Sequence, residues 1–173
     1  MKNVLKYSGI ISLILVAIAF ILMMATPSSS TDVLGSTVSF GGTIAIFGGK
    51  DLPLAQSGLI GATSAKPAVL GLLAWILILV GMIIVLLGII LPLLKVNALE
   101  KFAGILNLVA VICFVIGGIF MFIVVPSFFS AQGVNVPDKT AIGAGWVIGG
   151  ILAIAGGVFA ILPAAMDFIG KKK

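Results

Sequence analysis

The sequence has little charge and no histidine. Only 9% of its 173 residues are charged and 61% are apolar, whereas an ordinary soluble domain has about 25% charged residues. Without histidine there is no imidazole for acid–base catalysis, metal ligation or a pH switch near neutrality. The single cysteine, Cys113, cannot form a disulfide within the chain. These absences argue against a soluble fold and against several classes of enzyme and metal site.

The few charges are unevenly distributed along the chain. Seven of the ten lysines lie in three short clusters, at 2–6, 95–101 and 171–173, and long uncharged stretches separate the clusters. The formal net charge of +5 does not indicate a nucleic-acid partner, because a phosphate-binding patch must be contiguous on a soluble face. Here the lysines border apolar segments, which is a signal of membrane orientation.

Four uncharged segments are long enough to cross a bilayer, which takes about 20 residues of helix. Each must be helical, because lipid cannot satisfy the polar groups of an isolated strand. The sequence therefore predicts an all-α integral membrane protein, a four-transmembrane-helix bundle that forms a single membrane domain over residues 1–173 and has the lipid bilayer as a partner. The predicted helices span residues 7–26, 68–94, 102–125 and 141–166.

The lysine positions also predict the orientation, because cytoplasmic flanks of membrane helices keep the positive charge. With both termini inside, the inner segments carry seven lysines and two carboxylates, whereas the outer segments carry three lysines and three aspartates. We therefore predict a plasma (cytoplasmic) membrane protein with cytoplasmic N- and C-termini and with segments 27–67 and 126–140 outside.

The first outer segment contains two β-prone runs, 36–40 and 43–47, on either side of Gly41-Gly42. Because a Gly-Gly pair permits the positive φ of tight turns, the pattern predicts a small β-hairpin. A lone hairpin is marginally stable, so this one should lean on the helix ends or on another chain. The alternative is a flexible loop whose apolar residues dip into the interface. The candidate hairpin and association residues are Phe40, Gly41, Gly42, Ile44, Ile46 and Phe47.

The second outer segment is short and contains Phe128 and Phe129. Aromatic side chains at this depth are typical of interfacial anchors. We favour that interpretation over a ligand pocket.

Two alignments within the chain suggest an internal repeat. Residues 6–14 align with residues 101–109 with four of nine identical, and a Trp followed 17 residues later by a Pro occurs at 75–92 and again at 146–163. The pattern predicts a parallel duplication of a helical hairpin, with halves 1–97 and 98–173 related by an axis along the membrane normal. The alternative is that the same apolar residues recur in any membrane helix.

No Asp, Glu, Lys or Arg lies inside a predicted span. Such residues usually mark proton relays, ion sites and voltage sensors, so those functions are disfavoured. The carboxylates are scattered in the loops, and neither a phosphate-binding loop nor a dinucleotide fingerprint is present. We predict a non-enzymatic protein with no catalytic residues, cofactors or metals.

Ser12 and Asn107 are the main polar side chains within the spans, and the repeat alignment pairs them. We interpret both as hydrogen-bonding contacts between helices, with substrate binding as the alternative. Cys113 fits a small buried apolar residue, or less readily a lipidation site.

Small residues recur at every fourth position of the fourth predicted helix. This spacing produces a groove along one helix face, into which another helix can pack closely. A helix of the same bundle and a second protomer are both possible occupants. The groove residues are Ala141, Gly145, Gly149, Ala153 and Gly157.

The order of segments resembles the claudin-like tetraspan layout: a short inner N-terminus, a roughly 40-residue outer segment with β character, a tight inner turn, a short outer segment and a fourth helix. The resemblance covers the whole chain in topology. That family's first outer segment carries a Trp-Gly-Leu-Trp motif and a cysteine pair, whereas residues 27–66 contain neither Trp nor Cys, so no functional residue is transferred. The layout is equally similar to small uncharacterised four-helix membrane proteins of bacteria.

Two functions are compatible with these features. The first is a non-enzymatic membrane protein that self-associates as a homo-oligomer or serves as an accessory subunit for another membrane protein. The second is a small channel or transporter for an uncharged or lipid-like solute, which predicts a wet cavity near Ser12 and Asn107.

Overall fold

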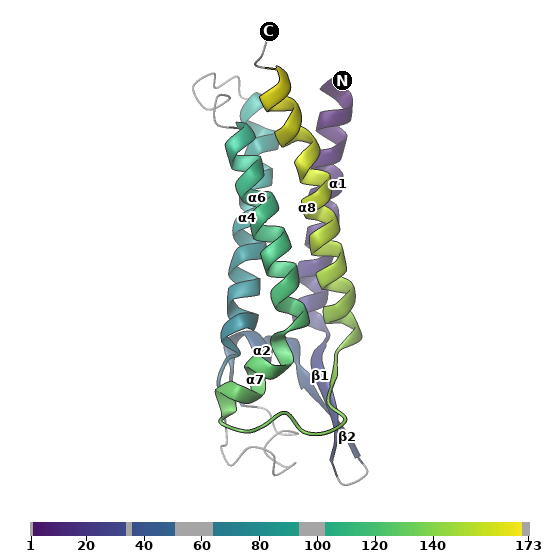
Figure 1. Cartoon of the computed structure of the whole chain (residues 1–173), viewed down its shortest axis with the longest axis vertical. Coiled ribbons are helices and arrows are strands. Elements are labelled where there is room, and N and C mark those ends of the chain that lie inside the picture. The colour runs from purple at the N-terminus through teal and green to yellow at the C-terminus, as the bar shows by residue number, and fades with distance from the viewer. Residues whose placement is uncertain (1, 34–35, 51–63, 94–102, 171–173) are drawn as a thin grey trace.

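Four long helices form a bundle in the computed structural model (Figure 1), which describes residues 2–33, 36–50, 64–93 and 103–170. Their apolar windows are 19 to 22 residues long, sufficient to cross the hydrocarbon core. The predicted four-span membrane bundle is therefore confirmed. The helices are α1 (Lys2–Ala25), α4 (Val69–Leu93), α6 (Ala103–Phe122) and α8 (Ala144–Gly170).

The four helices pack in the cyclic order α1, α8, α6, α4. Helix α8 makes extensive contact with both α6 and α1, α6 also packs closely against α4, and the contact between α1 and α4 is much smaller. The last helix thus holds the first and third together. Large side chains that are fully buried in this core include Val16, Met23, Ile78, Phe114, Met121 and Trp146.

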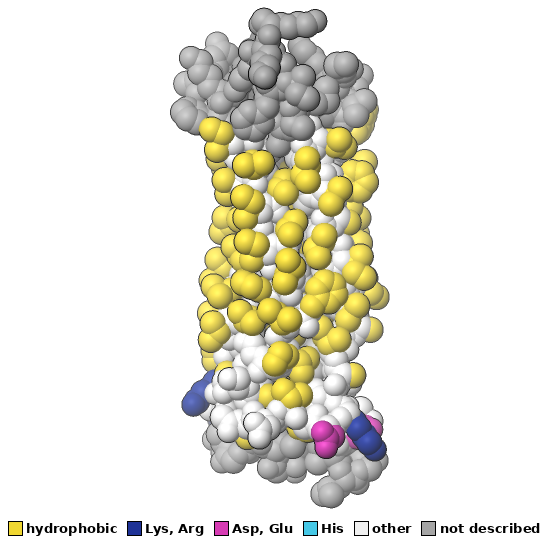
Figure 2. Space-filling view, in the orientation of Figure 1, with side chains coloured by type: hydrophobic (Ala, Val, Ile, Leu, Met, Phe, Trp, Pro, Cys, Tyr) yellow, Lys and Arg dark blue, Asp and Glu magenta, His cyan; other side chains and the backbone are white. Residues whose placement is uncertain are grey.

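The outside of the bundle is apolar along its length. Ile14, Ile83 and Ile151 are each half-exposed or more, and hydrophobic side chains cover the middle of the face shown in Figure 2. A continuous apolar surface of this kind is unfavourable in water, and it is stable when lipid chains cover it. The lysine and acidic side chains coloured in Figure 2 lie toward the end of the bundle that carries the β-sheet.

The third predicted helix, 102–125, is divided in two. Helix α6 ends at Phe122, and a second helix, α7 (Val124–Gln132), follows after Ile123. Pro126 explains the division, because a proline has no N–H for the carbonyl four residues earlier, that of Phe122, and its ring clashes there. The first half of the predicted outer segment 126–140 is consequently helical.

A three-stranded antiparallel sheet lies at the end of the bundle, in the order β2-β1-β3. Strands β1 (Pro27–Val33) and β2 (Ser36–Gly41) form a hairpin, and β3 (Ala141–Ile142) pairs with β1 on the other side. A small sheet after the first helix is confirmed, but the predicted strand pairing is wrong. The run 36–40 pairs with the preceding segment and not with the run 43–47.

The run 43–47 forms a short helix, α2 (Gly42–Phe47). Although its β-branched residues favour a strand, tertiary contacts decide the conformation: Ala45 and Ile46 are buried, and the Ala45 carbonyl accepts a hydrogen bond of 2.8 Å from the Ala68 N–H at the start of α4. Gly48, with φ of 70°, ends the helix. Gly41-Gly42 is therefore not the hairpin turn but the junction between β2 and α2.

The fourth helix begins at Ala144 and not at residue 141 as predicted. Ala141 belongs to β3, where it pairs with Ser30. The Gly143 N–H donates to the Ser28 carbonyl at 2.8 Å, while the Gly143 carbonyl accepts the first hydrogen bonds of α8. The strand pairing removes the first predicted turn of the helix, so Ala141 is not part of a helical groove.

Phe128 and Phe129 are buried, so the prediction that they are interfacial anchors is wrong. Both rings contact Phe40 of β2, with ring centroids 5.7 and 5.6 Å away. The break at Ile123 redirects α7 so that its aromatic face covers the sheet. The three rings form the aromatic cluster, which joins the two outer segments.

Gly42→Ala tests how closely the sheet approaches the bundle. A Cβ at Gly42 would overlap the Met23 carbonyl and lie 2.6 Å from the Thr26 carbonyl, whereas a Cβ at Gly41 meets nothing nearer than 3.4 Å. We expect Gly42→Ala to lower the free energy of unfolding by about 1–3 kcal/mol or more. Gly41→Ala is the matched control and should change it by less than about 1 kcal/mol. Equal thermal stabilities of the two variants in detergent would contradict this account.

Candidate functional site

The candidate site is the three-stranded sheet with helices α2 and α7, called the outer platform because it is built from the two segments predicted to lie outside. Its first attachment to the bundle is at Thr26, which follows α1. The Thr26 hydroxyl donates to the Leu22 carbonyl at 2.6 Å, and the Thr26 carbonyl accepts from the Gly42 N–H at 3.0 Å. Gly145 of α8 lies directly against the Thr26 side chain. Three chain segments thus meet at one residue at the end of the bundle that carries the sheet.

Helix α7 provides the second attachment through two polar side chains. Gln132 accepts from the Lys66 N–H at 2.9 Å and donates to the Lys66 carbonyl at 2.7 Å. The Ser127 hydroxyl accepts from the Leu70 N–H at 3.1 Å, which satisfies a free donor in the first turn of α4. These bonds hold the chain entering α4 against α7.

The two faces of the sheet differ in exposure. Val38 and Phe40 of β2 point toward the protein core, whereas Thr37 and Ser39 are exposed. The Thr37 hydroxyl donates to an Asp32 carboxylate oxygen at 2.9 Å. The exposed face is therefore polar and nearly uncharged, which suits contact with another protein better than contact with an ion.

The two edges of the sheet also differ. Beside β3, the hydroxyls of Thr140 and Thr31 are 3.0 Å apart, so side-chain contacts continue the short pairing at this edge. At the other edge, β2 has no strand neighbour among the described residues. Strand β2 otherwise contacts α2 and, through the Phe40 ring, α7.

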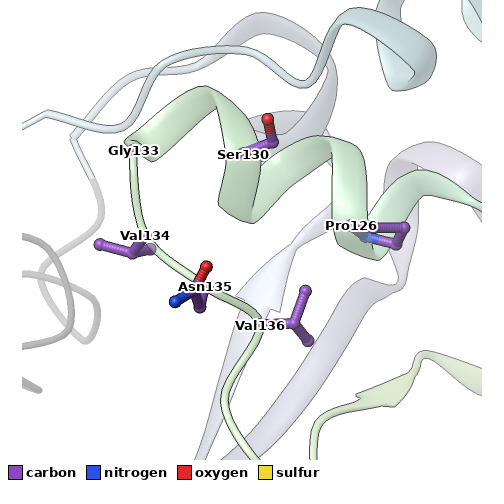
Figure 3. Close-up of a pocket in the computed structure, with 6 residues that line it drawn as sticks. All are labelled: Pro126, Ser130, Gly133, Val134, Asn135 and Val136. Carbon is purple, nitrogen blue, oxygen red and sulfur yellow. The ribbon is translucent and has the colours of Figure 1, made fainter.

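A shallow cavity of about 320 Å³ lies between α7 and the chain that follows it (Figure 3). It offers one hydroxyl and one side-chain amide, and no lining side chain can serve as an acid or base near neutral pH. The cavity can form hydrogen bonds but supplies no group for acid–base chemistry. The lining residues are Pro126, Ser130, Gly133, Val134, Asn135 and Val136.

The predicted association residues fall into three groups by their exposure. Phe40, Gly42 and Ile46 are buried within the platform and cannot contact a partner directly. Phe47 is 49% exposed, and its ring meets Trp75 of α4 edge-on at 5.2 Å. The remaining two, Gly41 and Ile44, are partly buried.

The helical positions of the predicted small-residue groove face other helices of the same chain. Gly149 lies near the Ala19 carbonyl of α1 and against Met121 of α6, and Gly157 faces Phe114 of α6. Ala153 is fully buried. Small residues on α8 therefore lie against both α1 and α6, which leaves this face closed to a second protomer.

Ser12 and Asn107 lie at different helix contacts. The Ser12 hydroxyl donates to the Gly156 carbonyl of α8 at 2.7 Å. Asn107 lies against Gly88 of α4, where its Oδ1 is 3.0 Å from the position of an added Cβ. The structure does not bring the two side chains together. The internal repeat that pairs them stays a prediction.

Trp146 is one of the residues at the site that the sequence reasoning did not select, together with Thr26, Ser127 and Gln132. Its side chain is fully buried between the sheet and the bundle, with Nε1 3.1 Å from the position of an added Cβ on Gly42. The sequence signal that could have identified Trp146 is its position directly after the Gly-Ala-Gly run at 143–145. Small residues let chain segments approach closely, and a large ring beside them fills the remaining space.

Fold and site together define a four-span integral membrane protein with an ordered outer platform. The chain matches no protein-family model and no curated protein. The claudin-like layout consequently rests on topology alone, and the function has to be argued from the geometry.

Gly149→Leu tests the α8 contacts. A Cβ at this position would lie 2.6 Å from the Met121 Cε and 3.3 Å from the Ala19 carbonyl oxygen, so the larger side chain must push α1 and α6 away. We expect a loss of about 1–3 kcal/mol in unfolding free energy. Ile148→Leu on the lipid-facing side, where the residue is 50% exposed, should have an effect within about 0.5 kcal/mol. Normal stability of Gly149→Leu in detergent would show that this contact is not close.

Proposed function

We propose that the chain is a non-enzymatic integral membrane protein that acts by association at its outer face, as a homo-oligomer or as an accessory subunit of a membrane assembly. The observation that carries the proposal is the outer platform. Segments from both outer connections form one sheet, and Thr26, Gln132 and the aromatic cluster fix it to the bundle. A loop that only links two membrane helices would not need these attachments, so we take the ordered platform as support for a binding role.

The chemistry of the platform supports binding over catalysis. Its exposed strand residues include Thr37 and Ser39, which carry hydroxyls, and Asp32, whose carboxylate accepts a hydrogen bond from Thr37 and has no second carboxylate beside it among the residues of the sheet. The cavity beside α7 has only a hydroxyl and an amide as polar side-chain groups. Groups of this kind form hydrogen bonds with a partner but do not transfer protons near neutral pH.

The alternative, a channel or transporter, has less support. The Ser12 hydroxyl is used in a buried bond to Gly156, and Asn107 lies at a separate helix contact. The proposed wet pathway between these two side chains therefore has no geometric basis in the described residues.

We also propose that the platform faces outward from the plasma membrane and that both termini are cytoplasmic, because the lysine excess lies at the opposite ends of the helices. Single cysteines in a Cys113→Ala background test this orientation. In intact cells a membrane-impermeant maleimide should label Ser39→Cys, and it should label Lys173→Cys only after lysis. The reverse pattern would overturn the orientation.

A photo-reactive phenylalanine analogue in place of Thr37 tests the association. Thr37 is exposed on the sheet, so illumination of native membranes should yield adducts with protein, either a second copy or a partner. The same analogue at Ile151, a lipid-facing position that is 56% exposed, should yield mainly lipid adducts. If the Thr37 variant is expressed and folded but forms no protein adduct, the proposed function fails.

A further inference from the structure

Asn107 is a polar side chain in a membrane-spanning helix whose amide finds no hydrogen-bond partner in the described part of the chain. The amide lies against Gly88 of α4, with Oδ1 3.0 Å and Nδ2 4.0 Å from the position of an added Cβ. Ser12, by contrast, donates to the Gly156 carbonyl at 2.7 Å. Of these two intramembrane polar side chains, Ser12 is therefore used inside the bundle, whereas the N–H groups of Asn107 remain available.

The amide occupies one of two equivalent positions along the α4–α6 seam, the line along which these helices pack. Two glycines of α4, seven residues apart, each face a side chain of α6: Gly81 faces Phe114, and Gly88 faces Asn107. The two side chains are also seven residues apart, which is the spacing of knobs that enter successive holes of a neighbouring helix. Phe114 is fully buried, whereas Asn107 is partly exposed. The seam is thus closed at Phe114 and accessible at Asn107.

The accessible position lies at the end of the bundle opposite the sheet (Figure 1), where α4 ends and α6 begins. The apolar window of α4 ends at Ile90, and that of α6 begins at Gly104. Gly88 and Asn107 lie two and three residues inside these windows, which is roughly 3–5 Å at about 1.5 Å per helical residue. This depth is the edge of the hydrocarbon core, where the ester carbonyls of glycerolipids join the acyl chains to the headgroup region.

The surroundings determine which acceptors the amide can reach. An amide without a hydrogen bond is unfavourable in an apolar environment, and the two N–H groups of Nδ2 are donors that require acceptors. The neighbouring exposed side chains of α6, Ile105 and Leu108, contain no polar atom. Acyl chains offer no acceptor either, whereas each ester carbonyl of a glycerolipid accepts hydrogen bonds. Lipid thus supplies the acceptor at this depth.

A second protein helix fits this position less well. Helices associate closely in lipid where small residues lie on the contacting surface. The glycines of α6 are all buried within the bundle, and the exposed residues around Asn107 are large, among them Ile105, Leu108 and Ile112. These side chains hold a second helix away, so the short Asn107 side chain does not reach an acceptor on it.

We propose that the Asn107 amide binds the ester carbonyl of a diacyl glycerolipid in the leaflet at the end of the bundle opposite the sheet. Nδ2 donates the hydrogen bond, and the absence of a side chain on Gly88 gives the amide its place in the seam. The site recognises the linkage between the acyl chain and the glycerol, and not the headgroup. The inference is independent of the function proposed for the outer platform, which lies at the other end of the bundle.

Competition between two phosphatidylcholines that differ only in their chain linkage tests the inference. The diester lipid has two carbonyls, whereas a diether lipid with the same headgroup and chain length has none. Full-length protein in detergent receives an equimolar mixture of both, and native mass spectrometry measures the species with one bound lipid. The diester lipid should be enriched about 2- to 10-fold, as expected for one hydrogen bond of ordinary net strength. Asn107→Leu, similar in size but without polar atoms, should bind both lipids equally.

Ser12→Ala is the matched control. It also removes one polar side chain from a span, but the Ser12 hydroxyl is used within the bundle, so this variant should keep the preference for the diester lipid. Asn107→Ala removes the amide without placing a larger apolar side chain against Gly88, and it should lose the preference as Asn107→Leu does. Thermal unfolding in detergent verifies that each variant is folded.

Three results would overturn the inference. The first is equal binding of the two lipids by the unsubstituted protein, which would leave water as the partner of the amide. The second is a diester preference that persists in a folded Asn107 variant, which would place the carbonyl contact elsewhere. The third is crosslinking between two copies through Asn107→Cys in a Cys113→Ala background in native membranes, which would assign the amide to a protein contact. None of these results changes what the Thr37 adducts show about the platform.

Discussion

The structure depends on the close approach of three backbone segments around Thr26. Gly42, Gly143 and Gly145 surround this residue, and an added Cβ at any of them would overlap a backbone or side-chain atom of residues 23–28. Because no side chain separates the segments, the Gly42 and Gly143 N–H groups reach carbonyls on the chain that leaves α1. The sheet, α2 and the start of α8 all take their positions from this junction.

The same constraint explains why the polar outer segments are ordered. Strand β1 is rich in serine, and Ser28, Ser29 and Thr31 are buried, a poor composition for a strand on propensity alone. Pairing on both edges and the aromatic cluster on one face compensate for this. Order in the sheet and its neighbouring helices therefore comes from contacts between residues distant in sequence, and these contacts rest on the end of the bundle.

The sequence predicted the parts of the fold that lipid dictates. Uncharged length alone located four spans, because an isolated apolar segment satisfies its own backbone polar groups in lipid only as a helix. Local signals predicted less of the outer face. The β-prone run 36–40 is a strand, but 43–47 is helical because Ala45 and Ile46 pack beside α4. Pro126 marked the end of α6, although the helical continuation in α7 depends on contacts with Phe40.

At the site, Phe47 is exposed whereas Phe40 and Ile46 are buried. No sequence pattern distinguishes the exposed residue from the two buried ones.

The two-residue strand β3 has a consequence for biogenesis. Strands β1 and β2 leave the ribosome together as local neighbours, but β3 and Trp146 follow about 100 residues later in the chain. The hairpin of β1 and β2 must therefore wait, with one strand edge and the space for Trp146 unfilled, until the segment that contains β3 and the start of α8 has been synthesised and reaches the same end of the bundle. The sheet can be completed only when the last helix has been inserted in the correct orientation, because β3 directly precedes that helix.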